Sequence, residues 1–163
     1  MKIDGIEIKD NLDILVIVGP TASGKTALSI KLAKELNGEI INGDAYQVYR
    51  KMNIGTAKIT EKEMDGIEHH LIDIVDYDEE FNVKIFQKML REKVETIKNK
   101  GKLPIICGGT GLYIQAGLYN YEFKEDEKFN ETKLKMEQKS LRKLQYYCLD
   151  NDIKLNESEF QNH

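Results

Sequence analysis

The chain has 163 residues, of which 40% are hydrophobic and 32% are charged, and its formal net charge is −4. This length is enough for one domain with a buried core and part of a second. The acidic balance excludes a general binder of polyanions, so any contact with nucleic acid has to come from a local patch. Because no apolar run approaches the roughly 20 residues of a membrane-spanning helix, we predict no association with a membrane.

The two cysteines, Cys107 and Cys148, are far apart and lack the C-x-x-C spacing of a thiolate zinc site. Cys107 stands in an apolar run, which favours a small core residue. This cysteine usage fits a reducing compartment, and we predict a cytoplasmic protein.

The first predicted element is a strand over residues 14–18, where five apolar and mostly β-branched residues follow one another. The alternation of Ile6 and Ile8 before it fits either a short edge strand or an irregular lead-in. A glycine-bounded loop with the sequence GPTASGKT comes next, and a helical apolar pattern then runs to about Leu36. This strand–loop–helix order around G-x-x-x-x-G-K-[ST] is the setting of a phosphate-binding P-loop.

The residue types in this loop suit a phosphate ligand. Gly19 and Gly24 allow tight bends, so that successive N–H groups point inward at the start of a helix, where the helix dipole also favours an anion. Lys25 adds a positive charge, and the Thr26 hydroxyl is a candidate ligand for Mg²⁺. We therefore predict that a diphosphate or ATP binds here. The predicted binding residues are Gly19, Pro20, Thr21, Ala22, Ser23, Gly24, Lys25 and Thr26.

Strands and helices alternate along the chain up to about residue 123. This alternation predicts an α/β fold, P-loop NTPase-like, with a doubly wound parallel sheet whose carboxyl edge binds ligands. Asp44 follows the second strand and should lie at that edge, beside the P-loop. Strands are predicted over 39–41, 69–74 and 103–107, and helices over 60–66, 83–99 and from 111 onward.

The composition changes near residue 124, where Lys and Glu become frequent. The apolar residues there form only a thin seam, made of Leu134, Leu141, Leu144 and Cys148. We predict a P-loop core over 1–123 and a partial helical segment over 124–163. The basic side chains of this segment fit either phosphate contacts or a solvated helix face, because Glu residues are interleaved with them. They are Lys133, Lys135, Lys139, Arg142 and Lys143.

Several motifs, in one order and spacing, resemble the tRNA dimethylallyltransferases, also called tRNA isopentenyltransferases. The resemblance covers residues 14–121 closely and the remainder weakly. It implies transfer of a dimethylallyl group from dimethylallyl diphosphate to the exocyclic amine of an adenosine next to the tRNA anticodon. The motifs are GPTASGKT at 19–26, Asp44 with QVYR at 47–50, IGTAK at 54–58, HHLID at 69–73 and GGTGLY at 108–113.

The resemblance also implies roles for single residues. Asp44 would accept the proton of the amine, while Lys25 and Thr21 would act on the diphosphate and Thr26 would hold Mg²⁺. The tRNA would be contacted by Asp44, Ala45, Tyr46, Gln47 and Thr110. The adjacent His69 and His70 lack the spacing of metal ligands. We predict that they form hydrogen bonds at the start of a strand.

The chain departs from the family pattern at three points. Ala45 stands where the family usually has Ser, and Ile59 stands where it usually has Pro. Family members are about twice as long, and this chain ends inside what resembles their helical tRNA-binding insertion. We therefore expect a truncated homologue that keeps the phosphate site but has weak or no tRNA modification, and whose open sheet edge causes marginal stability or self-association.

Two other functions stay open from the residues alone. A small-molecule kinase would bind ATP at the same loop, with Asp44 facing an acceptor hydroxyl. Such a kinase needs a lid with several arginines, and the chain has only Arg50, Arg91 and Arg142. A non-catalytic nucleotide-binding remnant would bind phosphates without turnover.

Overall fold

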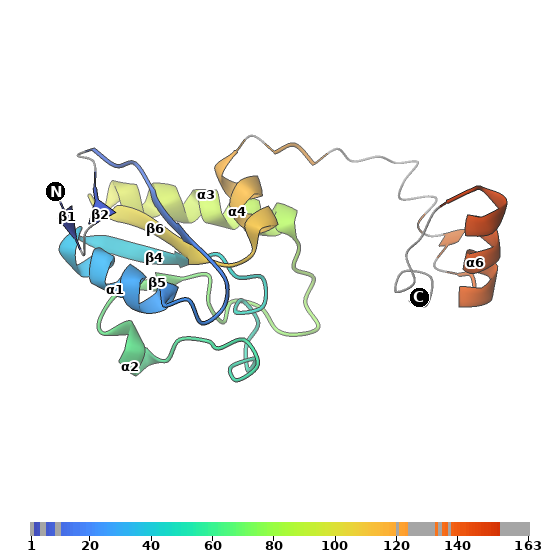
Figure 1. The fold of residues 1–163 in the computed structure, drawn as a ribbon, viewed down its shortest axis with the longest axis horizontal. Coiled ribbons are helices and arrows are strands. Elements are labelled where there is room, and N and C mark those ends of the chain that lie inside the picture. Colours follow the sequence, from blue (N-terminus) through green and yellow to red (C-terminus); the bar gives the residue numbers. More distant parts are fainter. Residues whose placement is uncertain are drawn as a thin grey trace. The chain divides into compact units, whose positions relative to one another are not determined.

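The computed structural model describes residues 2–3, 6–8, 11–119, 121–123, 133, 135–136 and 138–153 (Figure 1). The chain forms two compact units, Met1–Glu122 and Phe123–His163. Among the described residues, no helix is both long enough and apolar enough to cross a membrane.

A parallel four-stranded sheet forms the centre of the first unit, with the strand order β3-β6-β4-β5. Strands and helices alternate along the chain, which confirms the predicted α/β fold. The strands are β3 (Leu15–Val18), β4 (Gly38–Asn42), β5 (His69–His70) and β6 (Leu103–Gly108). The helices are α1 (Lys25–Glu35), α2 (Glu61–Met64), α3 (Val83–Asn99) and α4 (Gly111–Leu118).

Before the sheet, β1 (Lys2–Ile3) pairs in antiparallel fashion with β2 (Ile6–Glu7), so the Ile6 region is a strand of a short hairpin.

Hydrophobic side chains cover both faces of the sheet. Ile40 of β4 packs with Leu32 of α1 on one face, and Ile41 packs with Phe86 and Leu90 of α3 on the other. The two helices accordingly lie on opposite faces of the sheet (Figure 1). All five residues of β4 are buried, because a central parallel strand is covered on both sides. The loops at the carboxyl ends of the strands are therefore held by a well-packed core.

The strand predicted over 69–74 is wrong beyond its second residue. β5 ends at His70 because Leu71 and Asp73 adopt positive φ angles of 60° and 53°, which no strand accommodates. The chain then rejoins its neighbour through a single bridge between Val75 and Tyr49. The backbone bend after β5 brings the Leu71 carbonyl next to the end of β4.

In the second unit, the structure describes α6 (Leu141–Asp150), which begins after Ser140. Its Tyr146 and Leu149 side chains are exposed. Leu134, a part of the predicted apolar seam, lies outside the described residues.

Candidate active site

Three loops meet at the carboxyl edge of the sheet, after β3, β4 and β6. The Gly43 amide donates to the Cys107 carbonyl at 2.8 Å, and the Thr110 amide donates to the Gly43 carbonyl at 3.2 Å. Gly108 allows this approach, since a Cβ there would lie 2.3 Å from the Gly43 backbone. The loop after β4 and the loop after β6 are therefore fixed against each other.

The P-loop leaves β3 and enters α1 through a left-handed turn. Gly24 has a φ of 83° and Ala22 a φ of 62°, so the chain folds back before α1 begins at Lys25. The Lys25 ammonium donates to the Pro20 carbonyl of its own loop at 2.5 Å. Behind the loop, the buried Ser29 hydroxyl donates to the Thr26 carbonyl at 2.8 Å. The backbone of the loop thus bends back on itself, and the Lys25 side chain is hydrogen-bonded to that backbone.

Asp44 is half-buried at the end of β4, and its carboxylate organises the turn that follows. Its Oδ1 accepts hydrogen bonds from the amides of Tyr46 at 2.9 Å and Gln47 at 3.4 Å. Its Oδ2 accepts none from the residues that the structure describes. One carboxylate oxygen therefore fixes the turn, and the other takes no part in it.

Asn42 holds Asp44 in place, a role that sequence reasoning missed. Its side chain is 3% exposed, and its Nδ2 donates to the carbonyls of Asp44 and Leu71, both at 3.0 Å. Its Oδ1 accepts the Asp44 amide at 3.0 Å. The sequence feature that could have indicated this role is a polar residue at the end of a buried strand, two positions before Asp44.

The structure brings most residues of the predicted tRNA-binding set together. The Thr110 hydroxyl accepts the Ala45 amide at 3.0 Å, although 65 residues separate them in the chain. Tyr46 is 64% exposed. The Gln47 side chain instead donates to the Thr56 carbonyl at 3.0 Å, so its amide nitrogen ties two loops together.

Two cavities flank Asp44. The smaller has a volume of about 100 Å³ and lies under the P-loop, and the larger has about 560 Å³ and lies against residues 51–56. Thr21, Asp44 and Thr56 line both cavities. Asp44 therefore lines both the cavity under the P-loop and the larger cavity beside it, an arrangement that can bring two ligands together.

A buried lysine and two aromatic side chains make contacts that hold parts of the first unit together. The Lys58 side chain is 4% exposed, and its ammonium donates to the Tyr49 carbonyl at 2.6 Å and to Asp73 Oδ1 at 2.5 Å. Tyr113 packs against Phe86, with ring centroids 4.9 Å apart. Burial, followed by the nearby Tyr49 and Tyr46, raises the pKa of Tyr113. Tyr49 likewise packs against Phe81, with ring centroids 6.3 Å apart, whereas Tyr46 has an exposed ring.

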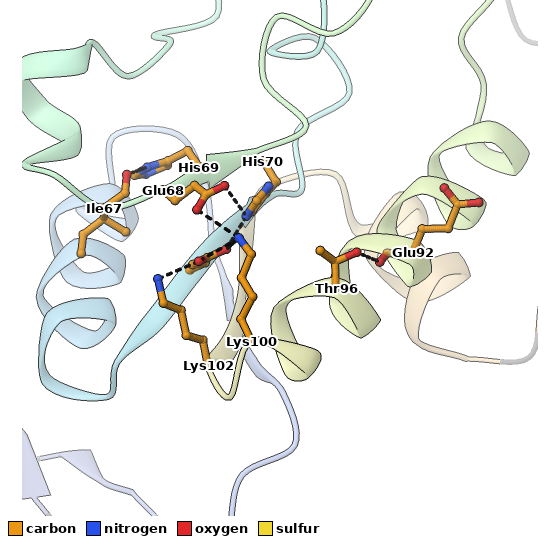
Figure 2. A network of polar contacts seen from close by, with 9 residues as sticks. Ile67, Glu68, His69, His70, Glu92, Thr96, Lys100 and Lys102 are labelled. Atoms are coloured by element: carbon orange, nitrogen blue, oxygen red, sulfur yellow. Dashed lines mark hydrogen bonds and ion pairs between the residues drawn. The ribbon is translucent and has the colours of Figure 1, made fainter.

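The two histidines make hydrogen bonds within the protein, as predicted. His69 Nδ1 donates to the Ile67 carbonyl at 2.9 Å, and burial lowers the pKa of His69. His70 Nε2 lies 2.8 Å from Glu39 Oε2. Figure 2 shows His70 in a network of charged side chains that includes Glu68, Lys100 and Lys102, and Glu39 lies near the amino end of β4.

This network contains ligand types that bind metals, but lysines hold its carboxylates. Glu39, Glu68 and His70 bring their ligand atoms within 4.8 Å of one another. Lys100 is hydrogen-bonded to both carboxylates, and Lys102 donates to Glu39 at 2.8 Å (Figure 2). Ammonium groups therefore provide the positive charge that a metal ion would otherwise supply.

Comparisons with known proteins identify the family of this chain. The family model described as IPP transferase matches residues 47–157. A tRNA dimethylallyltransferase of Staphylococcus aureus (strain bovine RF122 / ET3-1) is 56% identical over 138 residues, which is 85% of this chain and 43% of that protein. This chain thus spans less than half the length of that relative.

Solved structures of proteins with the same family name are also similar to this chain. A tRNA isopentenylpyrophosphate transferase from Staphylococcus epidermidis is 51% identical with a TM-score of 0.65, covering 84% of this chain and 46% of the other. The Bacillus halodurans enzyme is 42% identical with a TM-score of 0.67, covering 91% and 52%. A eukaryotic dimethylallyltransferase acting on tRNA is 40% identical with a TM-score of 0.66, covering 70% and 29%. The chain belongs to the IPP transferase family.

Proposed function

We propose that this chain carries the reaction site of a tRNA dimethylallyltransferase. The observation that supports the proposal most is the position of Asp44, between a cavity under the P-loop and a second cavity with an exposed tyrosine. The smaller cavity would hold dimethylallyl diphosphate. The larger one would admit the adenosine of the tRNA.

On the donor side, the C1–O bond of dimethylallyl diphosphate breaks and the diphosphate leaves with the electron pair. The N–H groups of residues 21–26 and the Lys25 ammonium stabilise this growing charge, after Lys25 leaves the Pro20 carbonyl. Thr21, which lines both cavities, would donate its hydroxyl to the leaving oxygen.

The residues at this position also fit Mg²⁺. The Thr26 hydroxyl lines the cavity under the P-loop, and an oxygen ligand of this kind is one that Mg²⁺ prefers. When bound, the ion would add positive charge beside the diphosphate.

On the acceptor side, the adenosine amine forms a bond to C1 and gives up a proton. Asp44 Oδ2 would take that proton, while Oδ1 remains bonded to the turn. The exposed ring of Tyr46 offers a stacking surface for a base that has turned out of its loop, and Ala45, Gln47 and Thr110 would complete the contact with tRNA.

The arginines argue against the kinase alternative. Arg50 is bound to Asp76 and to the Ile74 carbonyl, and Arg91 donates to the carbonyls of Gly117 and Tyr119. Both guanidinium groups therefore serve structural contacts within the first unit, whereas a kinase lid uses arginines to clamp a transferring phosphate.

The donor is tested by titrating the chain, with Mg²⁺, against dimethylallyl diphosphate and ATP in parallel. We expect tighter binding of the allylic diphosphate, and loss of that binding in Lys25→Ala. A preference for ATP would favour a kinase, and binding of neither ligand would indicate a remnant without a working site.

We further propose that the chain self-associates through β3. Among the described residues, β3 pairs with no strand other than β6, so it is an edge strand of the sheet. Sedimentation at increasing concentration should show dimers or larger species. A monomer with a sharp unfolding transition at high temperature would contradict this proposal.

A further inference from the structure

We infer that Lys58 is a positioning residue for the acceptor, because its buried ammonium holds the loop of residues 51–57 that walls the larger cavity. This inference rests on the proposed function, since it takes the larger cavity as the site that admits the adenosine of the tRNA. Lys58 itself lines neither of the two cavities. It therefore acts through the loop and not by touching a ligand.

One short loop supplies most of the wall of the larger cavity. Residues 51–56 all line this cavity, together with Thr21, Asp44 and Tyr46. Ile54, at the tip of the loop, is 97% exposed, so packing of the tip against the core does not hold the loop in place. The shape of the wall therefore depends on the bonds at the base of the loop.

Hydrogen bonds close the loop at its base. The Lys58 amide donates to the Asn53 carbonyl at 3.1 Å, and the Ala57 amide donates to the Ile54 carbonyl at 3.2 Å. Near the two ends of the loop, Lys51 and Ala57 have positive φ angles of 66° and 48°. Side chains other than glycine adopt such angles at a cost, which the surrounding structure has to offset. The loop is thus a small closed unit attached at Lys58.

The Lys58 side chain fixes this unit to the rest of the fold. It is 4% exposed, and its ammonium donates to the Tyr49 carbonyl at 2.6 Å and to Asp73 Oδ1 at 2.5 Å. A buried ammonium is costly unless it is paired, because water no longer hydrates it. The two bonds therefore define where the ammonium lies, and with it the base of the loop.

The two partners of Lys58 belong to neighbouring segments that are themselves bonded together. The Ile74 amide donates to the Val48 carbonyl at 2.8 Å. Val75 forms a parallel bridge with Tyr49. The Val48 side chain is fully buried, so this pair of segments is anchored in the core. Lys58 thus connects an exposed loop to a well-packed part of the first unit.

Asp44, the proposed proton acceptor, is held by other bonds. Asn42 is hydrogen-bonded to the Asp44 amide and carbonyl, and Asp44 Oδ1 accepts the Tyr46 amide. None of these bonds involves Lys58. A change at Lys58 should therefore weaken binding of the acceptor and leave the transfer step itself nearly unaffected.

The test is the substitution Lys58→Met, which removes the ammonium and keeps an unbranched side chain of similar length. Asp73 then loses its cation, but its side chain is 47% exposed and is hydrated, so the variant should fold. We expect affinity for an anticodon stem-loop RNA to fall about tenfold, because small displacements of binding groups have large effects. Affinity for dimethylallyl diphosphate should change less than about twofold, since P-loop N–H groups hold it.

Two further readouts separate positioning from a general loss of stability. In single-turnover transfer, the RNA concentration that gives half the maximal rate should rise about tenfold, while the maximal rate stays within about twofold. Hydrogen exchange of the Lys58 amide, which is bonded to the Asn53 carbonyl, should become about tenfold faster, whereas the amides of β4 keep their protection.

Two variants serve as controls. Asp73→Asn keeps a side-chain oxygen that accepts the Lys58 ammonium, so its affinity for RNA should stay within about twofold of the unaltered chain. Lys34→Met removes the same charge from the exposed ion pair with Asp65, whose side chains are 45% and 64% exposed. It should leave RNA binding unchanged, because Lys34 has no bond to the loop of residues 51–57.

The outcomes distinguish this inference from the proposed function. Equal RNA affinity of the unaltered chain and Lys58→Met, or an equal loss in Lys58→Met and Lys34→Met, would overturn the inference and leave the proposed function standing. So would a parallel loss of RNA and diphosphate affinity in Lys58→Met. If the unaltered chain binds dimethylallyl diphosphate but no RNA, the larger cavity is not the acceptor site, and the proposed function fails together with the inference.

Discussion

The two ends of the parallel sheet differ in how their charged groups are paired. At the amino ends, the Glu39 carboxylate is 1% exposed and is met by Lys100, Lys102 and His70 at 2.8–3.0 Å (Figure 2). At the carboxyl ends, Asp44 uses one oxygen for a turn, and Lys25 rests on a backbone carbonyl of its own loop. The charged side chains at the amino ends are thus paired with one another, whereas Asp44 and Lys25 at the carboxyl ends bond to the backbone of their own loops.

This difference shows how one set of strands serves two purposes. β4 carries Glu39 near its start and Asn42 at its end, followed by Asp44. The paired charge at the start holds β4, β5 and the α3–β6 turn together, while the charge after the end faces cavities. Substitutions at the two ends should therefore affect different measurements: stability at the amino ends, and ligand binding and transfer at the carboxyl ends.

The largest effect on stability is expected from Glu39→Ala. The change leaves the buried His70 and the two lysines without their shared anion. We expect the free energy of unfolding to fall by about 3 kcal/mol. This is the low end of the range for buried ion pairs, because both lysines reach solvent. Chemical denaturation measures it. An unchanged denaturation midpoint, or a loss of diphosphate binding in the folded variant, would contradict the proposed difference between the two ends of the sheet.

The same network predicts how stability depends on pH. Burial of Glu39 would raise its pKa, but hydrogen bonds from Lys102, His70 and Lys100 outweigh this and lower it from 4.5 to about 2. The folded state therefore binds this proton less readily than the unfolded state, so the stabilisation is complete above about pH 4.5 and is lost as the pH falls towards 2.

Denaturation midpoints measured between pH 6 and pH 2 test this dependence, with Glu39→Gln as the control, since it cannot titrate at this position. The unaltered chain should lose more stability than the variant across the range. Parallel curves for the two proteins would contradict the assigned role of Glu39.

A smaller loss of stability is expected from Gly108→Ala, with a clear effect on the site. The added Cβ would lie 2.3 Å from the Gly43 backbone, so the loops after β4 and β6 have to separate, at a cost of about 1–3 kcal/mol. Because Asp44 and Thr110 lie on these loops, ligand affinity should fall too. Gly111→Ala is the control, since a Cβ there meets nothing within 4 Å. Equal behaviour of the two variants would contradict the prediction.

The smallest effect is expected at an exposed ion pair. Lys34 and Asp65 form a salt bridge whose side chains are 45% and 64% exposed. Lys34→Ala should change the free energy of unfolding by about 0–1 kcal/mol, because water screens such pairs. A loss as large as that of Glu39→Ala would show that burial does not separate the two kinds of ion pair.

Much of the fold could be predicted from the sequence, because local patterns encode it. The apolar run before Gly19 and the three- to four-residue spacing in α3 follow from burial on a strand and on a helix face. The length of β5 could not be predicted, since Leu71 and Asp73 carry no glycine signal for their positive φ angles. The bend goes with a tertiary contact, the hydrogen bond from Asn42 at the end of β4 to the Leu71 carbonyl.

In the candidate site, too, local sequence motifs identify some residues, while other features depend on long-range contacts. The P-loop and Asp44 stand in recognisable local motifs, so they could be identified from the residues. The role of Asn42 depends on the Leu71 carbonyl, which is 29 residues away, and the link between Ala45 and Thr110 spans 65 residues. Contacts of this kind, and the two cavities that meet at Asp44, arise only when the chain folds.

The central claim is that Asp44 acts on the acceptor while the P-loop holds the donor. Single-turnover transfer of a labelled dimethylallyl group to an anticodon stem-loop RNA, with the unaltered chain and Asp44→Asn, tests it most directly. We predict slow but measurable transfer by the unaltered chain, a rate at least about 100-fold lower in Asp44→Asn, and equal affinity for dimethylallyl diphosphate. Equal transfer rates for the two proteins, or a loss of affinity for dimethylallyl diphosphate in Asp44→Asn, would contradict the claim.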